Sequence, residues 1–455
     1  MKRIALALTT VILTSFAVNS TQHTRLNVVT DCGIIPDDGL IDGPEYLLCQ
    51  EDLVAMGGGE LFFPCGTYDF NGTHYYYEVP VDSNVTLVGE SEGCVVLNTQ
   101  SANKAQRVVG TWWLDQRTVV NAGIKNLTIR GNRTTCPANG GVHQAHGIVI
   151  VNSEGFRASN VTIENVWGDG IYLSVWANNT SLPDMRVKDF CRNGMTVNSG
   201  TFAPTSSSLR VTNLDAQPAL DATYGYDFDA EGGIYELELA GSDLWVIHLG
   251  GVWNGNIHDN IIRSYVAAAY GDNIRMHHNT HTTEDARSAI NCDHCGMFTI
   301  SDSTFYCNNG LGDGTCIYTL GTYGDDAMSS VRNNVFVCET PPCYAAHKRI
   351  ADQARLNGDH FTFSGNKVIG GFTYGSVNSE VGSYHAYDNI IQATNWCISV
   401  GGGNGVQGEV NVHDNTYIDC TTDLKTNYPP HAFPITDHDA DLADLFDRVT
   451  ALETP

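Results

Sequence analysis

Apolar and polar residues alternate over short stretches of this chain, and the stretches recur as a repeat. Each copy holds an aliphatic or aromatic residue, two positions of any kind, and then Asn or Ser. The Asn or Ser positions are Asn132, Ser242, Asn260, Asn279, Ser303, Asn334, Asn366, Asn389 and Asn415. From Ser242 onward they fall 18–32 residues apart. A repeat of this length indicates a solenoid, in which each unit buries its apolar face only against its neighbours.

The residues that flank the repeat predict strands rather than helices. They read apolar-x-apolar with many Val, Ile, Tyr and Phe residues, whereas stripes at i and i+4 are absent. A strand-turn-strand unit repeated about a dozen times is a parallel β-helix, which we expect over residues 76–425. Asn tolerates a left-handed backbone. We therefore place the repeated Asn at the tight turns, with their amides stacked from rung to rung.

The segment before the repeat, residues 21–75, differs in pattern and reads as a cap. Pro44 starts a helical stretch over residues 44–56, and a Gly triplet ends it. A helix there would cover a sheet edge that invites aggregation when it is open. At the other end, residues 426–455 hold a Pro-containing linker and a short amphipathic helix.

The cap segment resembles the opening of a known superfamily. Val28-Val-Thr-Asp-Cys-Gly-Ile-Ile-Pro-Asp-Asp38, the helix, and then Gly57-Gly-Gly-Glu-Leu-Phe-Phe-Pro-Cys-Gly-Thr-Tyr68 are similar to the start of pectate-lyase-like (pectin-lyase-like) proteins. The resemblance implies an all-β fold, a right-handed parallel β-helix solenoid with an N-terminal capping helix. It also implies a carbohydrate-related function, although a fold does not fix the chemistry.

Residues 1–20 have the pattern of a secretory signal peptide. Met1-Lys2-Arg3 precedes an apolar run over residues 4–18, with small residues at Ala17 and Ser20 for cleavage. That run is too short to span a membrane comfortably. All 14 cysteines follow it, and an even number fits disulfides in an oxidising compartment. We therefore expect a secreted protein.

Three further motifs concern bridges, metals and glycans. Cys292-Asp-His-Cys295 is expected to be a disulfide, because a structural zinc site needs four ligands and no second Cys-x-x-Cys occurs. Cys307 with Cys316, and Cys338 with Cys343, are close enough in sequence to bridge loops. The His-rich residues 277–281 read as turn and surface, with metal binding as the alternative. Sequons, which predict N-glycosylation if the source is eukaryotic, begin at Asn71, Asn84, Asn126, Asn132, Asn160, Asn178 and Asn179.

Acidic residues dominate the charge. Lys and Arg number 24 against 51 Asp and Glu, which gives a formal net charge of −27. Such a surface repels nucleic acid and anionic membranes, and it repels polyanionic glycans unless a cation bridges them. We expect a polysaccharide or glycan as the partner, with neither nucleic acid nor a membrane span.

Aligning the Gly-apolar-x-apolar strands gives a candidate site. Side chains alternate along a strand, and the inward residues of the alignment are Ile148, Ile171, Met195, Tyr226 and Trp245. The outward polar patch then holds Asn198, Asp227, Asp229, His248 and Tyr270, with Tyr172 and Asp293 at its rim. We assign catalysis to Asp227, Asp229 and His248, and substrate binding to the remaining four residues.

The spacing of these groups suggests their chemistry. Asp227 and Asp229 lie two apart on one strand, which separates their carboxyl groups by roughly 6.5–7 Å and fits an inverting glycosidase. His248 would lie about 4.8 Å from Asp229 on the next rung, where it can orient or share a proton. Calcium held by Asp227, Asp229 and Glu231 is one alternative, and a solvated acidic face is another.

The stretch from Tyr224 to Asp227 is also similar to the catalytic strand of β-helix mannuronan epimerases. Tyr224, Gly225 and Asp227 match that strand, whereas Asp229 stands where the epimerases have His. One hypothesis is therefore a secreted carbohydrate-active enzyme of lyase, hydrolase or epimerase type, which works in a groove on the rod. The other is a non-catalytic structural, adhesive or glycan-binding β-helix that self-associates into filaments.

Overall fold

The computed structural model describes most of the chain between residues 24 and 426. The described ranges are 24–71, 77–99, 107–111, 117–136, 145–174, 176–198, 207–222, 225–282, 288–293, 295–308, 315–320, 328–349, 360–378, 383–400 and 410–426. The predicted signal peptide, the linker and the C-terminal helix lie outside these residues.

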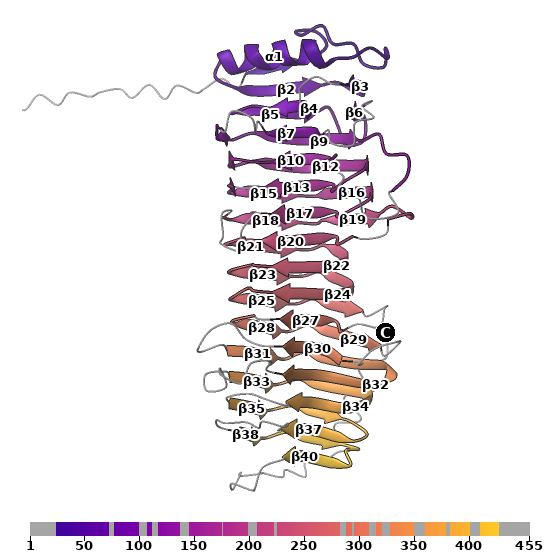
Figure 1. Ribbon diagram of the computed structural model, residues 1–455, viewed down its shortest axis with the longest axis vertical. Coiled ribbons are helices and arrows are strands. Elements are labelled where there is room, and N and C mark those ends of the chain that lie inside the picture. The colour runs from indigo at the N-terminus through magenta and orange to yellow at the C-terminus, as the bar shows by residue number, and fades with distance from the viewer. Residues whose placement is uncertain are drawn as a thin grey trace, which may run out of the picture.

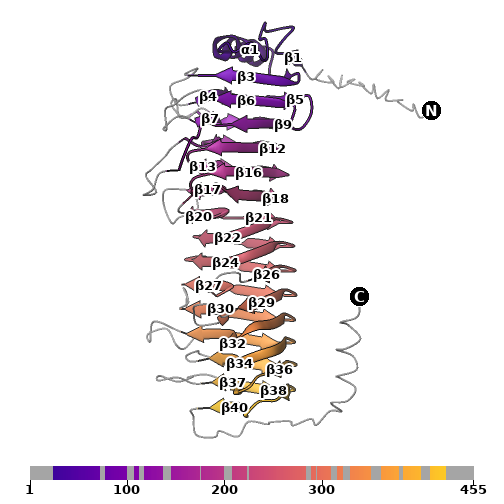
Figure 2. The same cartoon turned by 90° about the vertical axis from the view of Figure 1, so that its right-hand side faces the viewer.

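Strands of successive rungs pair in parallel along the described chain, and the rungs stack along one axis (Figures 1 and 2). The stack has three faces, and we call the one that carries the candidate site the site face. Its central strands are β7 (Arg107–Thr111), β10 (Ile148–Ile150), β13 (Ile171–Ser174), β17 (Met195–Asn198), β20 (Phe228–Gly232), β22 (Asp243–Gly250), β24 (Ile261–Ala269) and β27 (Ile290–Asp293). This arrangement confirms the predicted parallel β-helix.

A second face, which we call the turn face, ends at the turns that hold the repeated Asn. Its strands include β21 (Leu237–Ala240), β23 (Gly255–His258), β25 (Ile274–His277), β28 (Phe298–Ser301), β31 (Met328–Arg332), β33 (His360–Ser364), β35 (Ser383–Tyr387) and β38 (Val410–His413). The third face runs from β3 (Gly66–Phe70) to β39 (Thr416–Ile418). Long strands such as β24 bend around a corner and serve two faces, since β24 pairs with both β26 (Thr280–Thr282) and β27.

The helix α1 (Gly43–Ala55) lies across the N-terminal end of the stack, as predicted (Figure 1). Pro44 stands in its first turn, where a missing N–H costs nothing. Tyr46 is fully buried, packs edge-on against Phe70 and donates a hydrogen bond to the Pro80 carbonyl. The rungs themselves begin before residue 76, because β1 (Arg25–Asn27) already pairs in parallel with β2 (Gly59–Phe63).

The core column of the site face differs from our alignment in two successive rungs, those of β20 and β22. The paired inward residues are Ile148, Ile171, Met195, Phe228, Ile247, Val266 and Ile290. Tyr226 and Trp245 are therefore not core residues, and Trp245 is 42% exposed. Our alignment matched Gly225 with the glycines of the preceding rungs. The register instead places Asp227 opposite Gly194, so the inward residue of β20 is Phe228, two positions after Tyr226.

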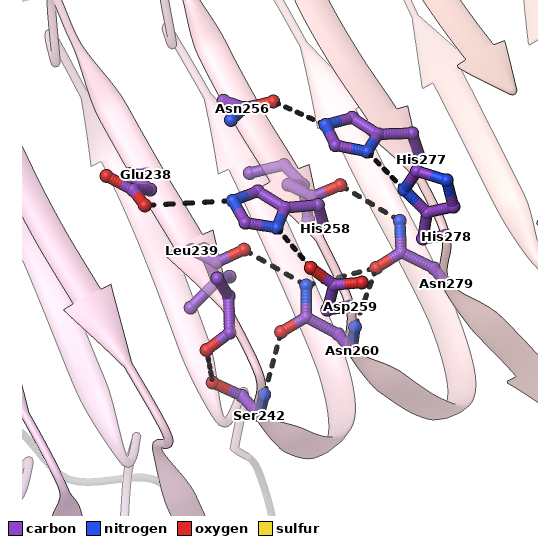
Figure 3. A network of polar contacts seen from close by, with 12 residues as sticks. Glu238, Leu239, Ser242, Asn256, His258, Asp259, Asn260, His277, His278 and Asn279 are labelled. Carbon is purple, nitrogen blue, oxygen red and sulfur yellow. Dashed lines mark hydrogen bonds and ion pairs between the residues drawn. The ribbon is translucent and has the colours of Figure 1, made fainter. Parts of the chain in front are cut away.

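The repeated Asn and Ser form a continuous ladder of side-chain hydrogen bonds from Ser242 to Asn415, with amides at the Asn and hydroxyls at Ser242 and Ser303. Figure 3 shows its start, where Asn260 Nδ2 donates to the Leu239 carbonyl and to Asn279 Oδ1, each at 3.0 Å. The left-handed residue of each turn is the one before the ladder position, as at Asp259 and His278. The Asn are thus at the turns as predicted. Their side chains form the hydrogen bonds of the turn, whereas the left-handed backbone conformation belongs to the residue before each Asn.

All fourteen cysteines are paired in seven disulfides, as expected for most of them. The bridges are Cys32–Cys49, Cys65–Cys94, Cys136–Cys191, Cys292–Cys295, Cys307–Cys316, Cys338–Cys343 and Cys397–Cys420. The Cys292-Asp-His-Cys295 motif is therefore a disulfide, and both predicted loop bridges are present.

Removing Cys136–Cys191 should cost more stability than removing any short bridge. It closes 55 residues, against three for Cys292–Cys295, and the stabilisation of a disulfide grows with the loop in the chain-entropy model. We expect the double Ser variant of Cys136 and Cys191 to lose about 2–4 kcal/mol in urea unfolding. The matching variant of Cys292 and Cys295 should lose clearly less, and equal losses would contradict this account.

Candidate active site

A hydrogen-bonded carboxylate–imidazole pair lies at the centre of the site face. The register places Asp229 of β20 opposite His248 of β22, and Nδ1 of His248 donates to Asp229 Oδ1 at 2.7 Å. The second oxygen, Oδ2, accepts from Asn193 Nδ2 at 2.8 Å. The ring of Tyr226 stacks on His248 with centroids 5.2 Å apart. A carboxylate that accepts from Nδ1–H fixes the tautomer, which leaves Nε2 as the proton acceptor.

The two members of this pair differ in exposure. Asp229 is only 3% exposed, whereas 29% of the His248 side chain reaches solvent. A substrate on the surface can therefore touch the imidazole but not the carboxylate. Asp229 is placed to orient His248, and His248 is placed to exchange protons with a bound molecule.

Asp227 does not share this surface with Asp229. It is 2% exposed, and its carboxylate accepts hydrogen bonds from the backbone amides of Trp245 and Val246 on the next rung. Burial raises its pKa from 3.8 to about 7. The expected outward pair of carboxylates is therefore absent, because the register gives Asp227 the place that glycine has in the preceding rungs.

The buried carboxyl of Asp227 predicts a pH effect on stability. Its folded-state pKa lies above the ordinary value of 3.8. The stability it contributes is thus present below that value and lost as the pH rises through about 7. Between about pH 5 and about pH 8, the urea midpoint of the wild type should fall more steeply than that of Asp227→Asn. The exposed Asp52→Asn in α1 is the control, and a wild-type slope matching that of Asp227→Asn would refute the expectation.

A buried polar column lies behind the pair and was missed in the sequence. His146, Asp169 and Asn193 each directly precede the aligned glycine of three successive rungs, and they are 0%, 0% and 4% exposed. The signal was available, since a polar residue before the glycine recurs at His146-Gly, Asp169-Gly and Asn193-Gly. Strand alternation alone does not reveal it, because these residues sit at the corner before the strand begins.

Hydrogen bonds connect this column to Asp229. The amide of Asp169 donates to His146 Nδ1 at 3.0 Å, and the amide of Asn193 donates to Asp169 Oδ1 at 3.1 Å. Asn193 then reaches Asp229 through its side chain. Burial raises the pKa of Asp169 to about 7, with Arg192 acting in the opposite direction. Asp169 Oδ2 has no hydrogen-bond partner and lies 3.3 Å from His146 Nδ1.

A charged cluster flanks the column toward solvent. Arg192 Nη2 contacts Glu231 Oε1 at 3.0 Å, and its Nε lies 3.4 Å from Asp169. Asn198 Nδ2 donates to the other oxygen of Glu231 at 2.7 Å. Tyr172 stacks on His146 with ring centroids 4.6 Å apart. Of the residues predicted to bind substrate, Asn198 and Tyr172 are thus gathered near the Asp229–His248 pair.

Tyr270 and Asp293 take other places than expected. The register pairs His248 with Ala267 on the next rung, and Ala267 with Asn291 on the rung after that. Tyr270 follows the end of β24 in a left-handed conformation and is 45% exposed. Asp293 pairs with Ala269, two positions along the strand from the column of His248. The displacement of Asp293 follows from the two-residue shift in the alignment of the β20 and β22 rungs, whereas Tyr270 lies three residues beyond Ala267.

The carboxylates predicted to hold calcium do not converge on one point. Asp227 faces backbone amides, Asp229 faces His248 and Asn193, and Glu231 faces Arg192 and Asn198. Their oxygens are occupied by N–H donors, whereas calcium needs six to eight free oxygens around it. These residues do not fit a calcium ion.

Comparisons with known proteins bear on the fold. No protein-family model matches the sequence, and no curated protein sequence matches it. Among solved structures, the chain is similar to PfbA, a surface adhesin of Streptococcus pneumoniae, at 14% identity and TM-score 0.54, with 84% of this chain and 93% of that one covered. It is also similar to the tailspike protein of E. coli bacteriophage HK620 in complex with a pentasaccharide, at 10% identity and TM-score 0.53, with 86% and 78% covered.

These likenesses define the class of fold as a right-handed parallel β-helix, as the resemblance of the N-terminal segment implied. In these two neighbours the fold serves an adhesin and a tailspike solved with an oligosaccharide. In the part of the chain that the structure describes, no helix is long and apolar enough to cross a membrane.

Proposed function

We propose that the protein is a secreted enzyme that acts on an extracellular acidic polysaccharide by proton transfer, with His248 as the catalytic base. The observation that carries the proposal is the Asp229–His248 pair, in which a buried carboxylate orients a partly exposed imidazole. Nε2 takes the proton from the carbon next to a uronic acid carboxylate, and the electron pair moves into that carboxylate. Reprotonation of that carbon by water on the other face gives epimerisation. In elimination the electron pair instead forms a double bond to the adjacent carbon, the bond from that carbon to the glycosidic oxygen breaks, and the leaving oxygen takes a proton from Nε2–H or water.

The state of the carboxyl groups favours this chemistry over hydrolysis. A glycosidase needs one carboxyl as proton donor and another as base or nucleophile, both in contact with the substrate. Asp227 and Asp229 are covered, and both oxygens of Glu231 accept from Arg192 and Asn198. Among the described residues around the pair, the partly exposed imidazole of His248 is the group best placed to exchange a proton with a bound substrate.

Arg192 supports an acidic substrate. Its guanidinium is permanently charged and sits on the rung beside Asp229, with the side chain 31% exposed. A substrate carboxylate can replace Glu231 as its partner, since Arg binds carboxylates through two parallel hydrogen bonds. Neutralising that carboxylate would also stabilise the negative charge that forms when the neighbouring carbon loses its proton. Arg192 is thus a local cation at the site of a chain whose formal net charge is −27.

The seven disulfides support secretion, because such bridges persist in oxidising compartments. N-glycosylation of the sequons remains a prediction, and Asn71, Asn84 and Asn179 are the exposed candidates. Asn126 and Asn160 are less suited to carry a glycan, because their side-chain amides already bond to each other, with Asn160 Nδ2 donating to Asn126 Oδ1 at 3.1 Å.

A non-catalytic glycan-binding or adhesive role is the second candidate. The exposed aromatic rings of Trp245 and Tyr270, 42% and 45% exposed, favour it. Such rings offer flat apolar surface on which sugars stack. In that case Asp229 and His248 would fix a binding surface, and self-association into filaments would accompany it.

A glycan panel separates the two candidates. We would incubate the purified protein with neutral and uronic acid polysaccharides, with and without Ca²⁺, and follow ultraviolet absorbance, reducing ends and sugar configuration. Unsaturated or epimerised product from uronic acid polymers supports the proposal. Reducing ends without unsaturation would mean hydrolysis, and binding without turnover would favour the second candidate.

A further inference from the structure

Three imidazoles and one carboxylate gather on the turn face, away from the Asp229–His248 pair. The register pairs His258 at the end of β23 with His277 at the end of β25. Their rings stack with centroids 4.9 Å apart and planes 4° from parallel. Asp259 and His278 follow them in the turns, and both adopt left-handed backbones, with φ of 56° and 53°. The same turn conformation on neighbouring rungs brings the two exposed side chains to the same side (Figure 3).

Within this group the donor atoms already form two close pairs. His258 Nδ1 lies 2.7 Å from Asp259 Oδ2, and His277 Nδ1 lies 2.9 Å from His278 Nδ1. Figure 3 shows both Nδ1 atoms directed toward the turn residues of their own rung. Two ring nitrogens at 2.9 Å cannot both carry protons, so at least one lone pair faces the other ring.

We propose that His258, Asp259, His277 and His278 bind a transition-metal ion of the Zn²⁺ class. Imidazole nitrogen and carboxylate oxygen are ligands that Zn²⁺ accepts in tetrahedral sites. Bonds of about 2.0–2.1 Å place two ligand atoms roughly 3.3 Å apart across such a site. The donor pair on each rung is already near that separation. The two pairs lie about one rung apart. Binding of one ion by all four groups therefore requires the exposed Asp259 and His278 to turn toward it and the His258 and His277 rings, 4.9 Å apart, to move closer together.

The neighbouring contacts hold the inner imidazoles in place for this role. His277 Nε2 contacts Asn256 Oδ1 at 2.9 Å, and His258 Nε2 lies 3.7 Å from Glu238 Oε1. Partners of this kind on the far nitrogen orient metal-binding histidines. The His-rich stretch therefore lies partly at the surface, as expected. Its third member, His281, is instead fully buried and stacks on Phe305 in the core.

The chain supplies a matched control on the same face. His413 at the end of β38 contacts Asp414 Oδ2 at 2.8 Å, which repeats the His258–Asp259 pair. Its stacking neighbour on the preceding rung is Tyr387, with ring centroids 5.3 Å apart, in place of a second histidine. This turn has the pair without the extra imidazoles, so it should not hold the metal.

Calorimetric titration of Zn²⁺ into metal-free full-length protein tests the proposal, with Co²⁺ absorption as a second readout. We expect one ion per chain and a tetrahedral Co²⁺ spectrum. His277→Gln or His278→Asn should weaken binding by at least about tenfold, while His413→Gln leaves it unchanged. Asn at 278 keeps a residue that tolerates the left-handed turn, and circular dichroism confirms the fold. Absence of binding to the wild type, or undiminished binding to both variants, would overturn the site.

Discussion

Replacing His248 by Gln should lower the turnover of a uronic acid polysaccharide by about 10²–10⁴-fold, the usual worth of a positioned acid–base group. The stability should change little, because 29% of the His248 side chain is exposed and it lies outside the core column. Gln retains a hydrogen bond toward Asp229 but cannot take up a proton near neutral pH. Steady-state kinetics and urea unfolding of the same preparation measure both effects.

Two companion variants sharpen this result. Asp229→Asn should reduce kcat on the order of 10²–10⁴-fold with KM little changed, because an amide no longer fixes the Nδ1–H tautomer of His248. His413→Gln changes an equivalent imidazole–carboxylate pair far along the rod and should leave kinetics unaffected. If His248→Gln kept full activity, the imidazole would not be the catalytic base.

The second large effect concerns the Asn ladder, where Asn334→Ala should lower the free energy of unfolding by about 3–5 kcal/mol. Asn334 is fully buried and donates to the Ile300 carbonyl at 3.1 Å, and its Oδ1 accepts from the Ser303 amide at 3.0 Å. Truncation leaves both backbone groups buried without these partners, at about 1–3 kcal/mol each. Urea unfolding followed by circular dichroism measures the loss.

The residue before it provides the control. Asn333 holds the left-handed place of the same turn, with φ of 55°, and its side chain is exposed. Gly adopts that conformation freely, so Asn333→Gly should change the free energy of unfolding by less than about 0.5 kcal/mol. Equal losses in the two variants would mean that the turn, and not the amide ladder, supplies the stability.

The fold could be predicted from the sequence because each rung repeats the same local pattern. Asn260, Asn279 and Asn334 mark the turns, and the alternating apolar residues between them fill the core. What the repeat could not supply is the register within an irregular rung. The segment between Asn198 and Asp227 is long, and the glycine at 225 suggested a strand start that lies two residues too early.

The candidate site was predicted in part for the same reason. Asp229 and His248 were paired correctly because our alignment was shifted by the same two residues in both rungs, which leaves the register between those rungs unchanged. Asp227 was wrongly placed on the outer surface. Alternation puts Asp227 and Asp229 on the same side of a regular strand, but the register puts Asp227 at the buried position that glycine occupies in the preceding rungs. His146, Asp169 and Asn193 were missed because they act at a corner, where neither strand nor helix periodicity applies.

The most direct test of the account is the fate of the proton that His248 is proposed to remove. We would treat a uronic acid polysaccharide with the protein in heavy water and follow the signal of the ring proton next to the carboxylate by proton magnetic resonance. We predict that this signal disappears, through either deuterium exchange or double-bond formation, and that it persists with His248→Gln. A wild-type reaction that releases new chain ends while the signal stays unchanged would contradict it.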